Sequence, residues 1–171
     1  MNSWFKEETK CVDGDEFLFK TIEDPDEKSR ICGDILSSIP EWFESEEANQ
    51  IYRRRIRNQI ALVVKKEGRA VGFLGLEDHN PYTSEIYVFG IRKGYQRHGL
   101  GRELVSMVTE ELRKHPEKKY LTVKTLGESR PDPFYEKTRA FYRKMGFLPL
   151  EEMKTLWSEN NPCLFMIKDL R

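Results

Sequence analysis

The segment of the sequence with the clearest chemical potential is basic, contains glycine and lies near the middle of the chain. No acidic residue occurs between Glu85 and Glu103. The basic residues of this interval are Arg92, Lys93, Arg97, His98 and Arg102. Its centre, residues 96–101, follows a β-rich run and directly precedes an amphipathic helical pattern. The start of a helix exposes unpaired N–H groups and the positive end of the helix dipole, and glycine lets a phosphate approach the backbone closely. The segment therefore predicts a pyrophosphate-binding loop.

Two common nucleotide-binding motifs do not account for this segment. A Walker loop that begins at Gly94 requires lysine after Gly99, where this chain has Leu100. A dinucleotide fingerprint that begins at Gly99 requires glycine at the position of Leu104. Neither nucleotide motif is therefore satisfied.

The segment resembles the acetyl-CoA loop of the GNAT superfamily of N-acetyltransferases. That loop has the pattern Arg/Gln-x-x-Gly-x-Gly/Ala after the fourth strand, and residues 96–101 match it. A second GNAT signature, Ala-x-x-Phe-Tyr-x-x-x-Gly-Phe, is similar to residues 140–147, where the Phe-Tyr and Gly-Phe pairs keep the family spacing and Ala140 is set closer. The resemblance covers residues 59–147 in element order, and residues 155–163 resemble the C-terminal hairpin of bacterial members of unassigned substrate. It implies an α+β, three-layer fold with a mixed, mostly antiparallel central sheet flanked by about four helices.

The resemblance also implies acetyl-CoA as the acetyl donor and assigns its contacts to two segments. The loop residues are Gln96, Arg97, His98, Gly99, Leu100, Gly101 and Arg102. The pantetheine arm is expected along residues 85–91, where backbone groups of Phe89 and Ile91 pair with its amides and the N–H of Phe89 or Gly90 faces the thioester oxygen. A glycine inside a strand indicates a bulge or a close backbone approach, and relief of crowding is an equal alternative for Gly90. Tyr135 stands where many members have a cofactor-contacting asparagine, so that role is not transferred to it.

Acetyl transfer to an amine requires a base for the amine and a proton for the departing thiolate. Glu85 is the candidate base, since some protein-acetylating members carry a catalytic glutamate at this strand position. A solvated glutamate at a strand start is the alternative, and His79 and Glu77 are weaker substitutes. Tyr142 is the candidate acid, because a phenol with a pKa of about 10 can protonate a thiolate whose parent pKa is about 8.5. The alternative for Tyr142 is a place in the aromatic core.

By the same resemblance, the acceptor pocket is built by the first two helices and the C-terminal hairpin. Its candidate lining residues are Trp42, Phe43, Tyr82 and Trp157, and each is also compatible with a core position. Such a pocket fits a small-molecule amine and a peptide N-terminus equally. The competing interpretation is a non-catalytic acetyl-CoA-binding sensor, which predicts CoA binding without turnover. An RNA-binding module is disfavoured, because the basic segment is short and has no aromatic-rich RNP-type strand beside it.

Capping signals and periodicity predict the elements that must position these residues. Asp24-Pro25 and Ser45 begin two helices, and the basic run 53–55 suits a solvated helix end. Ile51 is expected on the apolar face of the second helix. The predicted helices span residues 25–39, 46–55, 99–114 and 135–145. The predicted strands span residues 17–19, 59–65, 69–76, 85–91, 121–123, 147–156 and 163–168.

Length and composition limit the remaining possibilities. A chain of 171 residues favours one domain over residues 1–171, and 29 Lys+Arg against 29 Asp+Glu argue against nucleic-acid or membrane partners. The longest aliphatic run, residues 60–64, is far shorter than the ~20 residues of a bilayer span, and the N-terminal residues are too charged for a signal peptide. The cysteines at 11, 32 and 163 lack metal-ligand spacing. We therefore expect a cytoplasmic monomer or homodimer without a metal.

Overall fold

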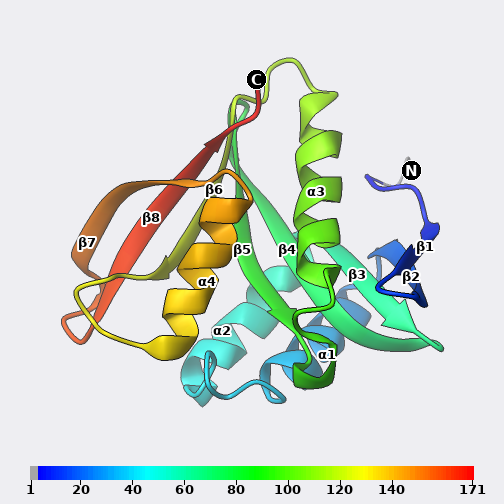
Figure 1. The fold of residues 1–171 in the computed structure, drawn as a ribbon, viewed down its shortest axis with the longest axis horizontal. Coiled ribbons are helices and arrows are strands. Elements are labelled where there is room, and N and C mark those ends of the chain that lie inside the picture. Colours follow the sequence, from blue (N-terminus) through cyan, green and yellow to red (C-terminus); the bar gives the residue numbers. More distant parts are fainter. Residues whose placement is uncertain (1–3) are drawn as a thin grey trace.

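An eight-stranded sheet forms the middle layer of this computed structural model, which describes residues 4–171 (Figure 1). The strands are β1 (Glu8–Val12), β2 (Asp15–Ile22), β3 (Ile60–Lys66), β4 (Arg69–Asn80), β5 (Thr83–Ile91), β6 (Tyr120–Leu126), β7 (Leu148–Ser158) and β8 (Asn161–Asp169). Their order in the sheet is β1-β2-β3-β4-β5-β6-β8-β7. Every neighbouring pair is antiparallel except β5 and β6, which are parallel. The expected mixed, mostly antiparallel sheet is confirmed.

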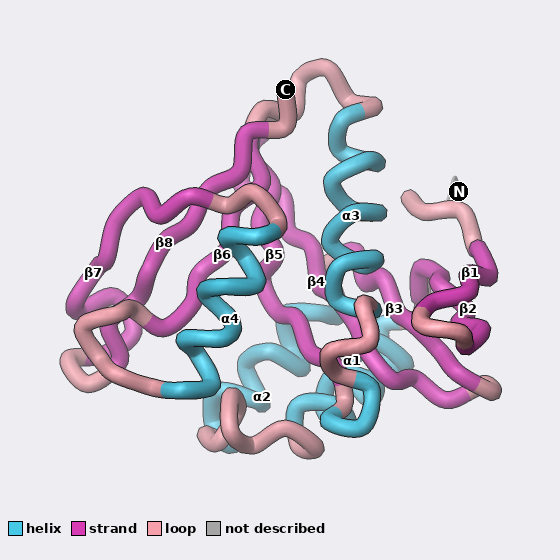
Figure 2. The backbone as a smooth tube through the Cα atoms, in the orientation of Figure 1, coloured by secondary structure: helices cyan, strands magenta, loops and turns pink. Residues whose placement is uncertain are grey.

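Helices cover both faces of the sheet (Figure 2). They are α1 (Pro25–Leu36), α2 (Glu46–Arg55), α3 (Leu100–Arg113) and α4 (Pro133–Lys144), with short 3₁₀ turns at Ile56–Asn58 and Lys93–Tyr95. One hydrophobic core lies between the sheet and α3 and includes Tyr142 of α4. A second core lies on the opposite face, where α1 packs. In the described part of the chain, residues 4–171, no helix is both long and apolar enough to cross a membrane.

Three of the four helices begin with a side-chain cap. Asp24 accepts a hydrogen bond from the N–H of Glu27 before α1, and Ser45 accepts one from the N–H of Ala48 before α2, as their sequence signals predict. Asp132 caps α4 in the same way, so this helix starts at Pro133 rather than at residue 135. The Asp-Pro signal at 132–133 repeats that at 24–25 and was sufficient to find this start.

Strands β5 and β6 separate from each other after a short paired stretch. They pair only from Thr83 to Ile86 on β5 and from Tyr120 to Val123 on β6. The antiparallel register between β4 and β5 shifts at this point, and Tyr87 is the extra residue on β5. A bulge bends a strand and increases its twist, so it directs the second half of β5 away from β6. Residues 87–91 of β5 thus have no strand partner on the β6 side.

Several element boundaries differ from the sequence expectation. The predicted strand at 17–19 is the middle of β2, and β1, which pairs with it, was not predicted. Strand β4 continues to Asn80, through a polar stretch expected to be a loop. Ile51 is 45% exposed, so its expected place on a buried helix face is wrong. Strand β7 contacts β8 alone as a strand partner, lies at the sheet edge, and has no buried residue.

Candidate functional site

The loop between β5 and α3 is held in a defined shape by its own side chains and by left-handed backbone. The amide nitrogen Nε2 of Gln96 donates to the carbonyl oxygen of Ile91 at 2.9 Å, which ties the loop to the end of β5. Arg97 and Gly99 have positive φ angles of 66° and 91°. His98 pairs through Nδ1 with Asp13 of the β1–β2 turn. These contacts shape the predicted pyrophosphate loop.

The first turn of α3 has backbone donors with no acceptor. Its N-cap is Gly99, and α3 has no side-chain cap. The first backbone bond of the helix runs from the N–H of Glu103 to the carbonyl oxygen of Gly99. Within residues 4–171, the N–H groups of Leu100, Gly101 and Arg102 therefore have no acceptor. An anionic group fits these donors and the positive end of the dipole, which is the chemistry that a pyrophosphate requires.

The glycine at 101 is needed for a different reason from the one expected. A Cβ atom there would lie 3.1 Å from Cζ of Phe89 and 3.5 Å from Cζ of Phe141. The sequence suggested that glycine lets a phosphate approach the backbone, but the structure fills the Cβ direction of Gly101 with the two rings. Leu100 is buried in the core and anchors the helix, and Arg102 is exposed beside the loop.

The second half of β5, residues 87–91, is not paired with β6, so some of its backbone N–H and C=O groups point toward β6 without bonding to that strand. The N–H of Arg92 donates to the carbonyl oxygen of Val71 on β4 at 2.8 Å. Alternate residues of a strand use the same edge, so Phe89 and Ile91 direct their backbone groups toward the β6 side. There they have no β6 partner. The Ile91 carbonyl oxygen accepts from Gln96, and the remaining groups of this edge fit the amides of a pantetheine arm.

Gly90 serves the packing of α1 instead of forming the bulge. A Cβ atom at this position would lie 3.2 Å from both Ile35 and Ile39. Ile39 lies beyond the end of α1 and follows it in a turn. The expected bulge is present on this strand, but at Tyr87. Of the two interpretations of Gly90 from the sequence, the structure supports relief of crowding.

Tyr142 lies in the core on the α3 side of the sheet. It is 5% exposed, and its ring packs against Phe141 and Phe147 with centroids 5.4 and 5.5 Å away. Its hydroxyl forms no hydrogen bond among the described residues. Burial, with a smaller contribution from Tyr135, raises the pKa of Tyr142 above its usual value. The residue thus keeps its proton and has a donor available.

Glu85 lies on the opposite face of the sheet and is already paired. Its side chain is 3% exposed, and both carboxylate oxygens lie 2.8 Å from Nζ of Lys124 on β6. His79 of β4 contacts one of the same oxygens through Nε2. Because α1 and α2 cover this face and Tyr142 lies on the other, the two candidate catalytic residues are on opposite sides of the separated strands. The weaker candidate Glu77 binds Arg55 and Gln59 instead.

Aromatic side chains gather beside Glu85 at the α1–α2 connection. Phe43 packs against Tyr52 of α2, which packs against Tyr87 of β5, and both centroid distances are 5.7 Å. The Trp42 indole donates to Oγ1 of Thr138 at 3.0 Å, and the Trp42 carbonyl oxygen accepts from the Tyr135 hydroxyl at 2.7 Å. Burial raises the pKa of Tyr52 to about 12. We call Trp42, Phe43, Tyr52, Tyr87 and Tyr135 the aromatic group.

The other two expected acceptor residues do not join this group. Tyr82 is 58% exposed in the turn before β5, and its carbonyl oxygen accepts from the N–H groups of Lys119 and Tyr120 at the paired end of β5 and β6. Trp157 is 44% exposed near the end of β7. The described residues contain no ring contact for either side chain.

Sequence reasoning missed residues that the fold brings to this site. Tyr87 is two positions from Glu85 on the same strand, a spacing that was a usable signal. Tyr52 was assigned only to a helix face, and Lys124 gave no signal because it lies 39 residues from its partner Glu85. In residues 4–171, no group of three or more His, Cys, Asp or Glu side chains is placed to hold a metal ion.

Comparison with known proteins identifies the family of the chain. The model of the acetyltransferase (GNAT) family matches residues 29–147. The chain belongs to the GNAT acetyltransferase family, and the resemblance, enzyme class and acetyl-CoA cosubstrate expected from the sequence are confirmed at the level of this family.

Individual relatives are more distant. A mycothiol acetyltransferase of Corynebacterium glutamicum is 34% identical over 67 residues, which cover 39% of this chain and 23% of that protein. A GNAT-family structure from Desulfovibrio desulfuricans has a TM-score of 0.76 at 16% identity, with 91% of this chain and 99% of that chain covered. A GNAT acetyltransferase from Elizabethkingia anophelis, solved with acetyl-CoA bound, has a TM-score of 0.61 at 18% identity and covers 80% of this chain and 88% of its own. The two structures establish a shared fold.

Proposed function

We propose that the chain transfers the acetyl group of acetyl-CoA to a primary amine of a small molecule or a peptide. One observation carries this proposal: the uncapped first turn of α3 continues into the free backbone edge of β5. The first provides N–H donors for a pyrophosphate, and the second provides donors and acceptors for pantetheine amides. The proposal therefore assigns cofactor contacts to Phe89, Ile91 and the loop residues 96–102.

On the cofactor side, the loop residues have distinct roles in this proposal. The N–H groups of the first turn of α3 receive the pyrophosphate, Gly99 supplies the left-handed backbone before this turn, and Gly101 leaves room for the rings of Phe89 and Phe141. The exposed Arg97 and Arg102 contribute positive charge. Gln96, His98 and Leu100 hold the loop in place through the contacts described above. The N–H of Phe89 faces the thioester oxygen, whereas Gly90 acts through helix packing.

The catalytic step uses one group from each face of the sheet. The acceptor amine attacks the thioester carbon, a C–N bond forms, and the C–S bond breaks. Tyr142 donates its hydroxyl proton to the departing thiolate, since its raised pKa keeps that proton in place. Glu85 accepts the proton of the amine, and His79, whose side chain is 38% exposed, connects the carboxylate to solvent. This proton then passes from Glu85 through the His79 contact to water, and Tyr142 is reprotonated from solvent.

The aromatic group forms the acceptor side in this proposal. Trp42 and Phe43 lie on the same face of the sheet as Glu85, and Tyr52 and Tyr87 connect Phe43 to it. Contact of Tyr82 or Trp157 with the acceptor is proposed only for an acceptor that extends beyond this group, such as a peptide. The acceptor class, a small molecule or a peptide, is the part of the proposal that a screen must narrow.

A non-catalytic acetyl-CoA sensor is the second candidate function, and one observation favours it. Glu85 is 2% exposed and is bound by Lys124 and His79, so it is engaged before any acceptor arrives. In a sensor this ion cluster is purely structural. The sensor predicts acetyl-CoA binding with no amine-dependent release of CoA.

A screen of amines, amino acids and peptides for CoA release, read by a thiol-reactive dye, separates the two functions. Release that depends on an amine and falls in the Tyr142→Phe variant supports the transferase. Binding of acetyl-CoA by calorimetry without release for any acceptor supports the sensor. Competition between CoA and an oligonucleotide tests the expectation of no nucleic-acid partner. The cytoplasmic location, the single domain over residues 1–171, the lack of a membrane partner and the monomeric or homodimeric state stay predictions.

A further inference from the structure

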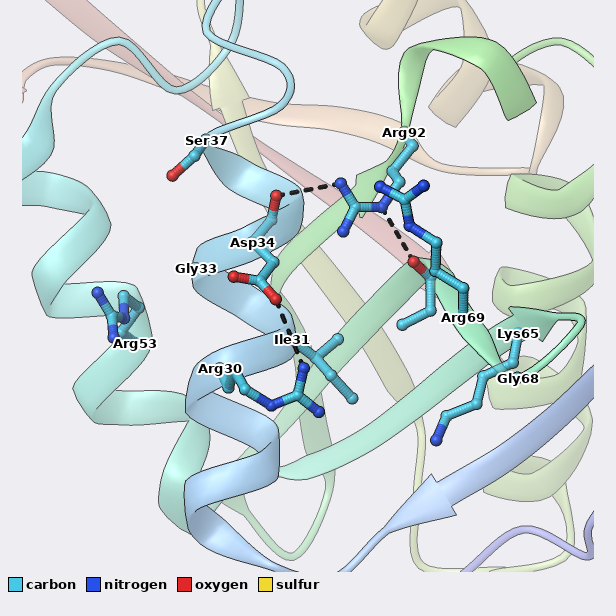
Figure 3. Close-up of a pocket in the computed structure, with 11 residues that line it drawn as sticks. Arg30, Ile31, Gly33, Asp34, Ser37, Arg53, Lys65, Gly68, Arg69 and Arg92 are labelled. Atoms are coloured by element: carbon cyan, nitrogen blue, oxygen red, sulfur yellow. Dashed lines mark hydrogen bonds and ion pairs between the residues drawn. The ribbon is translucent and has the colours of Figure 1, made fainter.

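A basic groove crosses the outer side of α1, on the sheet face opposite to α3 (Figure 3). Its volume is about 590 Å³. The groove is bordered by α1, α2, the β3–β4 turn and the residue that follows β5. The charged side chains that line it are Arg30, Asp34, Arg53, Lys65, Arg69 and Arg92, and we call this site the α1 groove.

The α1 groove has more positive charge than its carboxylates neutralise. Arg30 pairs with Asp34 at 3.5 Å, and Lys65 pairs with Glu27 at 3.2 Å. No carboxylate oxygen of the described residues lies within 4.0 Å of the three remaining arginines, at 53, 69 and 92. The groove therefore has a local excess of positive charge in a chain whose formal net charge is zero.

Arg53 has a buried donor that lacks an acceptor. Its Nε atom is shielded from solvent and has no hydrogen-bond partner in the described structure. The side chain lies directly over Gly33 of α1, where a Cβ atom would be 2.9 Å from both Cδ and Nε of Arg53. Glycine at this position thus makes room for the guanidinium. Because Nε is enclosed against α1, a ligand in the groove meets the partly exposed remainder of the Arg53 side chain, which contributes its positive charge.

Arg92 is fixed by backbone contacts and lies beside another arginine. Its Nε donates to the carbonyl oxygen of Ala70 at 3.0 Å, and its Nη1 donates to the carbonyl oxygen of Asp34 at 3.3 Å. Figure 3 shows the Arg69 side chain next to it. Burial, and then the charge of Arg69, lower the pKa of Arg92 from its usual value. Two adjacent guanidinium groups repel each other, and an anion that bridges them relieves this repulsion.

We propose that the α1 groove binds an anion of the phosphate class with two or more negative charges, at a site separate from the first turn of α3. Figure 3 shows Arg69 and Arg92 together on one side of α1 and Arg53 on the other, so the arginines border the groove from both sides of the helix. A phosphate or pyrophosphate group has enough oxygens to serve several guanidinium forks at once, whereas a carboxylate has two. This proposal does not depend on acetyl transfer.

The test is calorimetric titration of inorganic pyrophosphate into protein saturated with CoA, so that the loop before α3 is filled. We expect one binding event for the unmodified protein. The Arg53→Gln, Arg69→Gln double variant should bind at least tenfold more weakly. Arg54→Gln, an exposed neighbour on α2 outside the groove, is the matched control and should bind as the unmodified protein does. Inorganic phosphate, titrated in parallel, shows whether a single phosphate group is sufficient.

A second variant separates loss of the site from loss of the fold. Gly33→Ala displaces the Arg53 side chain, while alanine favours the helix, so the melting temperature should stay equal or rise as pyrophosphate affinity falls. The proposal is overturned if pyrophosphate does not bind to the unmodified protein. It is also overturned if the double variant and Gly33→Ala both bind pyrophosphate as tightly as the unmodified protein does. If pyrophosphate binds only in the absence of CoA, and the double variant weakens CoA itself, the groove belongs to the cofactor site and the proposed separate site is wrong.

Discussion

Replacing Tyr142 by phenylalanine tests the proposed acid because the structure predicts a large loss of rate with little change in stability. The substitution removes one hydroxyl and keeps the ring that packs between Phe141 and Phe147. A general acid contributes about 10²- to 10⁴-fold to a rate. A loss of about 10²-fold in turnover corresponds to about 2.7 kcal/mol in the barrier, since each factor of ten is about 1.36 kcal/mol.

The expected effect on stability is small. The hydroxyl has no protein partner among the described residues, but it is not one of their solvent-shielded unpaired atoms, so water can satisfy it. We therefore expect Tyr142→Phe to leave the free energy of unfolding unchanged to within about 1 kcal/mol. Tyr135→Phe is the comparison, because it breaks the hydrogen bond to Trp42 and should lower stability by about 0.5–1.5 kcal/mol.

Three measurements decide the outcome: urea unfolding, acetyl-CoA affinity by calorimetry, and single-turnover CoA release. The acetyl-CoA affinity of Tyr142→Phe should equal that of the unmodified protein. The rate loss should be the same at every pH of the assay, because burial keeps Tyr142 protonated throughout. If Tyr142→Phe retains the full single-turnover rate, water protonates the thiolate and Tyr142 is a core residue. If Tyr142→Phe is clearly less stable and yet keeps the full rate, both the rate argument and the stability argument are contradicted.

The remaining predictions concern the loop, its charge and the base. Gly101→Val should abolish acetyl-CoA binding, because the new side chain displaces the rings beside the first turn of α3; unchanged calorimetric affinity in a folded variant would remove the loop assignment. Acetyl-CoA affinity should fall with added salt, and Arg97→Ala or Arg102→Ala should reduce both the affinity and the salt slope, so a flat response contradicts the charge argument. Glu85→Gln should lower turnover most at pH values where the amine is protonated and least at alkaline pH; an effect absent at all pH values places the base elsewhere. Gly90→Ala should lower the unfolding free energy by about 1 kcal/mol through crowding against α1, with little change in acetyl-CoA affinity, and the reverse pattern would return this residue to the cofactor site.

Local signals in the sequence were sufficient for the elements and for the cofactor loop. The caps at Asp24 and Ser45 act on N–H groups three residues away, so neighbouring residues alone determine them. The loop at residues 96–101 combines glycine, positive charge and a helix start within six positions, and the structure has an uncapped helix at this place. The sequence by itself therefore determined the family, the order of most elements and the loop at which the cofactor phosphates are proposed to bind.

Only the tertiary structure decided what surrounds the proposed catalytic groups. Glu85 meets Lys124 because β5 and β6 pair in parallel over four residues, and the bulge at Tyr87 ends that pairing. Packing of distant segments also placed Arg53 over Gly33, in a run that the sequence assigned to a solvated helix end. Such contacts depend on strand register and on helix-to-sheet packing, which are set by burial over the whole molecule. No pattern within one segment encodes them, so the acceptor side and the α1 groove became visible only in the folded chain.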